Sequence, residues 1–210
     1  MFKSVIAGVS DMNRITSRAA RFGLMSAAAL GLSACGVNSI PTKEEAVKAK
    51  WGDVENQYQR RADLIPNLVA TVKGFAAQEK DVLEGVTKAR ASASQVTVDP
   101  SKLTDPAQMA KFEAAQGQVG SALGRLLVTV EKYPDLKSNE NFLQLQSQLE
   151  GTENRITVAR RDYNEAVQGY NTEIRTFPSI VAAKVIYGSQ PIAPFKATTA
   201  NANTAPAVKF

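Results

Sequence analysis

Histidine is absent from this sequence, and cysteine occurs once, at Cys35. Without histidine the chain cannot build Ser-His or Cys-His catalytic pairs, and it lacks the commonest protein ligand of transition metals. The Glu-x-x-His pairs of di-iron helical bundles are therefore missing as well. Because there is one cysteine, no disulfide can form within the chain, so packing must stabilise the fold. These absences predict a protein that is not an enzyme and that has no catalytic, metal or cofactor site.

The N-terminal apolar stretch is too short to cross a membrane. Residues 22–34 are 13 in number and include two glycines and two serines, whereas a spanning helix needs roughly 20 apolar residues. Four basic residues precede the stretch, and Leu32-Ser33-Ala34-Cys35 ends it. A basic region, an apolar region and small residues form the layout of a secretory signal, and a cysteine directly after them is typical of bacterial lipoproteins. We therefore predict a signal peptide over residues 1–34, acylation of Cys35, and a lipid-anchored tether over residues 35–41.

Two alternatives remain open for this region. Cys35 could be an ordinary buried cysteine, and translation could start at Met12 rather than at Met1. Gly36, in place of an aspartate after the cysteine, is similar to an outer-membrane sorting signal. If the cell has two membranes, the protein is then expected in the outer membrane, facing the periplasm. Removal of residues 1–34 lowers the net charge from +5 to +2, so the charge of the sequence does not indicate a nucleic-acid partner.

Behind the anchor, apolar residues recur with the spacing of long helices. Thr42-Lys43-Glu44-Glu45 fits a capping box, which predicts a helix start there, directly after Pro41. From Val47 to Ala93 the apolar residues alternate at four and three positions, and only Arg61 and Glu79 interrupt them. This 3.5-residue period predicts a single helix of about fifty residues that packs against a partner helix. Pro66 lies within it and predicts a kink.

The rest of the chain predicts two more long helices and a short one. Asp105 and Pro106 suit the start of a helix to about residue 132, in which Gly117, Gly120 and Gly124 are expected to allow close approach of a neighbouring helix. A third helix is expected from Ser138 or Asn139 to Phe177, and a short last helix over residues 179–187. The predicted fold is therefore an all-α, elongated antiparallel bundle over residues 42–187. Residues 188–210 have little apolar content and are expected to form a flexible tail.

Several segments in order resemble one protein family. They are Gln59-Arg60-Arg61-Ala62-Asp63-Leu64-Ile65-Pro66-Asn67-Leu68-Val69, residues 71–75, residues 133–142, Glu153-Asn154-Arg155-Ile156, residues 159–164, Tyr170-Asn171, residues 177–179 and residues 206–210. With these motifs the chain resembles the LemA family. The resemblance implies a membrane-attached helical bundle to which no enzymatic activity is generally assigned. Many family members begin with a transmembrane helix, whereas this chain has the lipoprotein signal instead.

The polar residues of these motifs allow a structural and a recognition role. Arg60, Arg61, Asp63 and Asn67 could form a recognition patch, or they could brace the helix at Pro66 by satisfying backbone groups that the proline leaves unpaired. Glu153, Asn154 and Arg155 lie next to Ile156 and could pair with Arg61 or Asp63, which would fix the helix register.

Two classes of function follow for such a protein. One is a lipid-anchored interaction or scaffold module of the cell envelope, which binds an unknown envelope protein. The other is an architectural element that self-associates or shapes membrane. Exposed apolar residues on the second helix or in residues 180–187 would favour the first. An apolar and basic stripe that lies flat on the bilayer would favour the second.

Overall fold

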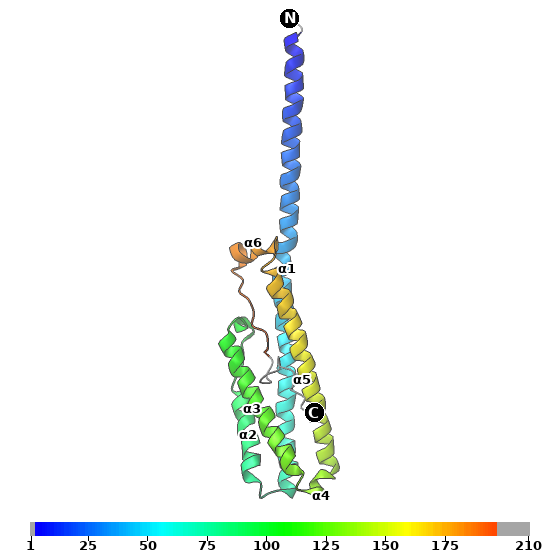
Figure 1. Ribbon diagram of the computed structural model, residues 1–210, viewed down its shortest axis with the longest axis vertical. Coiled ribbons are helices and arrows are strands. Elements are labelled where there is room, and N and C mark those ends of the chain that lie inside the picture. The colour runs from blue at the N-terminus through cyan, green and yellow to red at the C-terminus, as the bar shows by residue number, and fades with distance from the viewer. Residues whose placement is uncertain (1–2, 197–210) are drawn as a thin grey trace, which may run out of the picture. The chain divides into compact units, whose positions relative to one another are not determined.

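The computed structural model describes the backbone of residues 3–196 and the side chains of residues 38–196, and this part of the chain contains helices and no strand. The predicted all-α fold is confirmed. The helices shown in Figure 1 are α1 (Lys3–Phe75), α2 (Lys80–Ser94), α3 (Pro106–Val130), α4 (Pro134–Lys137), α5 (Glu140–Glu173) and α6 (Ser179–Ala182), with a 3-10 turn η1 (Pro100–Lys102) and a π-helical turn η2 (Ala183–Tyr187).

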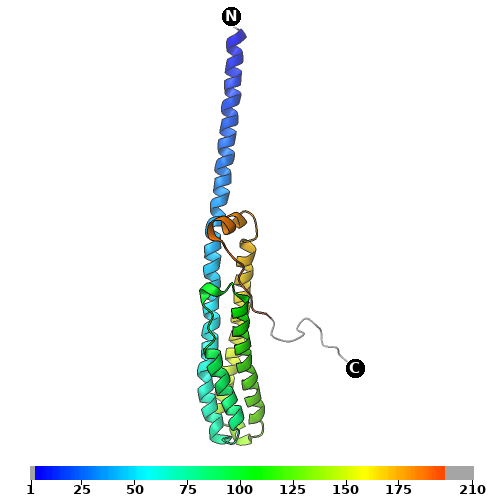
Figure 2. The ribbon, with the colours of Figure 1, turned by 90° about the vertical axis from the view of Figure 1, so that its left-hand side faces the viewer.

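The chain forms two compact units, and each is described by itself. The first, here called the anchor unit, combines residues up to Lys43 with Thr172–Ser189. The second, the bundle unit, combines Glu44–Asn171 with the residues from Gln190 on. In the bundle unit, α1, α2, α3 and α5 follow one another with alternating direction (Figures 1 and 2), so each long helix is antiparallel to the next.

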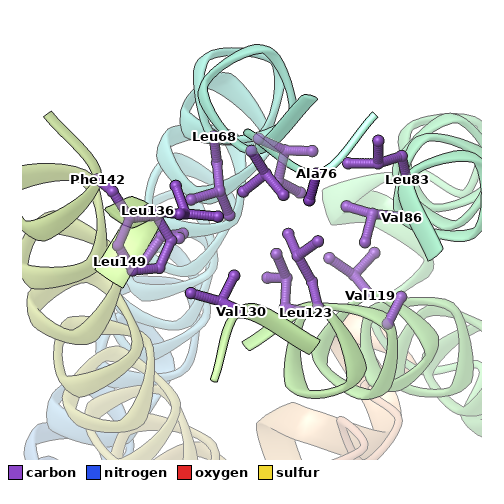
Figure 3. Close-up of a cluster of buried hydrophobic side chains, with 14 of the residues drawn as sticks. Leu68, Ala76, Leu83, Val86, Val119, Leu123, Val130, Leu136, Phe142 and Leu149 are labelled. Atoms are coloured by element: carbon purple, nitrogen blue, oxygen red, sulfur yellow. The ribbon is translucent and has the colours of Figure 1, made fainter. Parts of the chain in front are cut away.

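The core of the bundle unit is made by the seam residues that the sequence predicts on α1. Their side chains are at most 7% exposed: Val47, Trp51, Val54, Tyr58, Arg61, Ile65, Leu68 and Val72. Leu68 meets Leu83 and Val86 of α2, Leu123 and Val130 of α3, and Phe142 and Leu149 of α5 in one cluster (Figure 3). The 4-3 spacing therefore identifies the buried side of α1 correctly up to residue 72.

The prediction of one helix from Val47 to Ala93 is wrong, because the chain turns back after Phe75. The N–H of Glu79 bonds to the carbonyl of Ala76 (3.1 Å), and α2 begins at Lys80. The Tyr133 hydroxyl donates to Glu79 Oε1 (2.9 Å), and Gln78 Nε2 donates to that hydroxyl (3.0 Å). A residue far along the chain thus braces the turn. The bundle unit consequently contains the shorter helix α2, of 15 residues, beside the three long helices α1, α3 and α5.

The predicted helix start at Thr42 is also wrong. Helix α1 begins at Lys3 and passes through residues 35–41, which were expected to form a tether, and through Pro41. Inside a helix, backbone N–H groups bond to the carbonyl four residues earlier. The N–H groups after Thr42 are therefore not helix-end groups, and the Thr42 side chain is not needed as an N-cap. Its hydroxyl donates instead to the carbonyl of Asn38 (2.8 Å). The side chains of residues 1–34 and of Cys35 lie outside the described residues.

The starts of the other two predicted helices are confirmed. The Asp105 carboxylate accepts from the N–H groups of Ala107 (2.8 Å) and Gln108 (3.4 Å), and Pro106 occupies the first position of α3. Asn139 Oδ1 accepts from the N–H of Phe142 (3.1 Å), which caps α5. Both caps depend on residues close in sequence, and this is why local patterns find them.

The expected use of the α3 glycines is not observed within the chain. Gly117, Gly120 and Gly124 are exposed, and a Cβ atom added to any of them would meet nothing within 4 Å. They therefore allow no close approach between helices of the described part of the chain, and they leave one side of α3 open there.

Residues 190–196 do not form the expected flexible tail. Ile192 and Phe195 are 5% and 6% exposed. Asn171 of α5 donates to the carbonyl of Ile192 and accepts from its N–H, both at 2.9 Å. Asn164, two helical turns earlier, makes the same pair of bonds to Phe195 at 3.1 and 2.8 Å. Each asparagine side chain thus satisfies the backbone N–H and carbonyl of one residue in this extended segment, as a neighbouring β-strand would in a sheet. Residues 197–210 lie outside the described residues.

This segment, here called the strap, closes an aromatic cluster. Phe195 stacks on Trp51 with ring centroids 5.8 Å apart, and Tyr163 meets both rings edge-on at 5.5 and 5.3 Å. The Tyr163 hydroxyl donates to the carbonyl of Ala193 (3.0 Å), and burial raises its pKa. The strap therefore completes the core beside Trp51, although the sequence offers only two large apolar residues for this purpose.

In the anchor unit the expected short last helix is present as α6 and η2. The expected third helix ends at Glu173 rather than at Phe177, and Phe177 is 84% exposed instead of lying on the seam. Gly188 adopts a left-handed conformation (φ 58°) after η2, and this conformation favours glycine because it has no Cβ.

We expect Gly117→Ala and Gly124→Ala each to raise the free energy of unfolding by about 0.5–1 kcal/mol, because alanine favours the helix and meets no neighbour. Denaturant unfolding measures this change. As a matched control, Gly188→Ala should lower stability by about 1 kcal/mol, because its backbone is left-handed. A loss of stability in the α3 variants would contradict the open surface described above.

Candidate functional site

Arg61 is a buried charge at the centre of the bundle unit, with 4% of its surface exposed. Its Nη1 donates to Glu153 Oε1 of α5 (3.0 Å). Its Nη2 donates to Gln116 of α3, at the side-chain Oε1 (2.6 Å) and at the backbone carbonyl (3.2 Å). The guanidinium also lies 4.9 Å from the centre of the Tyr58 ring. One side chain of α1 therefore binds to both α3 and α5.

The electrostatics of this cluster suit a fixed contact. The Arg61 guanidinium is a rigid planar fork of donors, so it holds its acceptors in fixed positions. Burial raises the pKa of Tyr58, and the positive charges of Arg160 and Arg61 oppose part of that rise. The Glu153 side chain is 47% exposed, so water as well as Arg61 stabilises its charge. These groups hold the helices α1, α3 and α5 in register.

The structure brings only two of the seven predicted polar residues together. Arg61 and Glu153 form the ion pair that the sequence suggested. Asp63 points to the surface and accepts from Gln59 Nε2 (2.8 Å). The other four are also exposed: Arg60, Asn67, Asn154 and Arg155. Gln116 was not predicted, since a glutamine on a mostly apolar helix gives no sequence signal of its own.

The carbonyl that Pro66 leaves without its helical donor has a partner on α2. Pro66 has no N–H to give to the carbonyl of Ala62, four residues earlier. Arg90 Nε donates to that carbonyl instead, at 2.7 Å. The expectation that Asn67 braces this position is therefore corrected: the donor comes from α2, which the sequence did not reveal as a separate helix.

A small pocket lies beside the Arg61 cluster. It has a volume of about 110 Å³, and its walls include Tyr58, Arg61, Arg90, Phe112 and Gln116. A pocket of this size holds a few water molecules, whereas sites for drug-sized ligands and cofactors measure about 300–1,000 Å³. It does not provide a site for a larger ligand.

A larger and open groove runs between α2 and α3, with a volume of about 730 Å³. Small residues form its floor, and they repeat at four and three positions on both helices. They are Gly85, Ala89 and Ser92 on α2 and Ala110, Ala114, Gly117 and Ser121 on α3. Lys88, Glu113 and Arg125 also line the groove. On α3 the same spacing continues to Gly124 and to Val128, which is 71% exposed.

Glu173 joins three segments of the anchor unit. Its Oε1 accepts from the hydroxyl groups of Ser39 (2.6 Å) and Ser179, and its Oε2 lies 3.0 Å from Lys43 Nζ. These hydrogen bonds lower the pKa of Glu173 from an ordinary value of 4.5 to about 2, the Ser179 bond contributing most. The carboxylate therefore fixes the start of α6 against α1. It was not predicted, because its partners lie 134 and 6 residues away.

The acidic residues of the described part gather at no metal site. Within residues 38–196 no group of three or more aspartate, glutamate or cysteine side chains could hold a metal ion. Glu44 and Glu45 pair with Lys48, and Glu150 accepts from Gln146. Among the described residues, no helix is both long enough and apolar enough to cross a membrane.

We expect Arg61→Ala to lower the free energy of unfolding by about 3 kcal/mol, at the low end for a broken buried pair because Glu153 can be hydrated. Adding Glu153→Ala should cost less than the sum of the two single changes, since the pair is already lost. Denaturant unfolding of the four proteins measures the coupling. Arg60→Ala, the exposed control, should stay within about 0.5 kcal/mol. Strictly additive single changes would contradict a coupled pair.

We expect the contact of α6 to weaken in acid. Because the pKa of Glu173 in the folded protein is about 2, below its ordinary 4.5, its contribution is fully present above pH 4.5 and is lost as the pH falls toward 2. Hydrogen exchange of the residue 180–183 amides, corrected for intrinsic rates, measures the loss. Glu173→Gln should remove this pH dependence. Equal dependence in both proteins would assign the transition to another group.

Comparison with known proteins identifies the relatives of this chain. A sequence profile of the LemA family matches residues 50–210. Magnetosome protein MamQ 2 of Paramagnetospirillum magneticum is 31% identical over 157 residues, which cover 67% of this chain and 58% of that protein. Protein LemA of Metamycoplasma hominis is 30% identical over 140 residues, covering 67% and 60%. The chain thus spans less than two thirds of the length of these curated relatives. By the profile match over most of its length, the chain belongs to the LemA family.

Proposed function

We propose that this protein is a membrane-anchored scaffold of the cell envelope that binds a helix of a partner protein in the groove between α2 and α3. The observation that carries the proposal is the pair of small-residue rows along this groove. Two rows with 4-3 spacing present a 3.5-residue period, which is the spacing with which helices pack side by side. The partner would add a further helix to the bundle unit.

The residue types of the groove support a helical occupant. Small side chains let a helix backbone approach closely, and the α3 row contains residues that no part of the described chain covers. Lys88, Glu113 and Arg125 supply both signs of charge, which can set the direction and register of a bound helix. An amphipathic helix with its anchors at i, i+3, i+4 and i+7 fits such a surface.

Anchoring through acylated Cys35 is the second part of the proposal. The sequence around Cys35 has the lipoprotein layout, and helix α1 runs without interruption from this region into the bundle unit. A lipid on Cys35 would therefore hold the bundle at the exported face of a membrane, which is the outer membrane if the cell has two. The absence of catalytic chemistry belongs to the same proposal, since the buried polar groups of the bundle join helices to one another.

A second copy of this chain is the alternative occupant. The row from Ala110 to Val128 lies on one side of a single helix, so two α3 helices could pack against each other through the same residues. Such a contact would make the protein a self-associating architectural element. The experiment below distinguishes the two occupants.

The test is a photo-crosslinking residue in place of Ser121, in intact cells. We expect an adduct with another protein, with crosslinked positions three or four residues apart on its sequence. Gly117→Leu should abolish the adduct, because a bulky side chain there occupies the groove, while its Cβ meets nothing within 4 Å.

Gly74→Leu provides a matched control, since Gly74 is also helical and exposed with nothing within 4 Å of an added Cβ. It should leave the adduct unchanged. An adduct of twice the chain's mass would establish self-association instead, and loss of the adduct in the control as well would refute the groove as the binding site.

A further inference from the structure

The anchor unit exposes a concentrated apolar surface around α6 and η2. Nine large apolar residues among residues 38–196 are exposed, and five of them lie within residues 177–187. This apolar patch consists of Phe177 (84% exposed), Val181 (56%), Val185 (79%), Ile186 (62%) and Tyr187 (43%). Scattered single apolar residues are normal on protein surfaces, but a group of this kind marks a binding surface.

We propose that the apolar patch inserts into the headgroup region of the membrane that holds Cys35, and so provides a second contact with lipid. This inference rests on the proposed anchoring at Cys35. It goes beyond that proposal because it assigns a lipid-binding surface to a segment about 140 residues further along the chain.

The hydrogen bonds of Glu173 place the patch close to the anchor along α1. They tie the start of α6 to Ser39 and Lys43. These residues follow Cys35 by four and eight positions in the same helix, which corresponds to about 6 and 12 Å of helical rise. The headgroup layer on each side of a bilayer is about 5–8 Å thick. A lipid attached to Cys35 therefore brings the start of α6 to the depth of the headgroups.

The charges of this segment are complementary to an anionic lipid surface. Residues 174–189 contain no aspartate or glutamate, whereas Arg175 and Lys184 are both exposed beside the patch. Apolar side chains with interspersed cations are typical of segments that lie in the membrane interface, where the cations meet anionic headgroups. Tyr187 adds an aromatic ring of the kind enriched at this level of the bilayer.

The sequence had linked exposed apolar residues in this region to a partner protein. The short distance along α1 from Cys35, together with the two cations, makes the bilayer the occupant that the structure supports better. A partner protein then becomes an outcome that the experiment can detect.

The experiment uses the acylated full chain in vesicles of phosphatidylcholine and phosphatidylglycerol that contain nitroxide-labelled lipid. Val185→Cys carries an environment-sensitive fluorophore, and Cys35 does not compete for the label if it is acylated. We expect a blue-shifted emission that the nitroxide lipids quench. Val158→Cys on α5 is the control, because Val158 is an exposed apolar residue of the bundle unit rather than of the anchor unit.

Each outcome of this experiment distinguishes insertion of the patch from an alternative. Quenching at residue 185 but not at residue 158, weakened by Lys184→Gln and Arg175→Gln, supports insertion of the patch. If the protein binds the vesicles but residue 185 is not quenched, insertion of the patch is refuted, whereas the proposed anchoring at Cys35 is not. If residue 185 is protected from an aqueous quencher in native membranes but not in the vesicles, the patch binds a protein instead. Labelling of the unsubstituted chain at Cys35 would instead refute the acylation on which the inference rests.

Discussion

The buried guanidinium of Arg61 is the constraint on which the bundle depends. A charge with 4% exposure is tolerated only where acceptors surround it, and α1 itself supplies none of the hydrogen-bond acceptors that Arg61 uses. Gln116 of α3 and Glu153 of α5 must therefore stand at fixed heights relative to Arg61. A shift of either helix by one turn, about 5.4 Å, would leave the guanidinium unpaired. Apolar side chains tolerate such sliding more easily, so this one contact selects a single register for three helices.

The sequence predicts those parts of the fold that depend on neighbouring residues. The seam of α1 follows from the spacing of Val47, Trp51 and Val54, and the caps at Asp105 and Asn139 follow from side chains that reach their own helix ends. The turn at residues 76–79 could not be predicted in this way, because the apolar spacing continues across it into α2. Its brace is Tyr133, more than fifty residues away, and no local pattern contains that information.

The residues of the candidate surfaces could likewise be predicted from the sequence only in part. Arg61 and Glu153 could be paired in advance because each interrupts or adjoins an apolar seam, whereas Arg60, Asn67, Asn154 and Arg155 look similar in sequence and lie exposed. The sequence predicts the glycines of α3 as sites of close approach, but it does not reveal that no described helix covers them. Asn164 and Asn171 also belong to the family motifs, which by themselves indicate no role for them. Their separation of seven places them on one side of α5, a signal that could have suggested a shared extended partner.

The strap affects the order in which the core of the bundle unit can form during synthesis. Trp51 lies in the first quarter of the sequence, yet the ring that stacks on it, Phe195, is among the last residues described. The helices can associate as they emerge, but the indole stays incompletely covered until Phe195 has been made. Contacts of such large sequence separation close late and slow folding. The aromatic end of the bundle is therefore the part of the described core that is completed last.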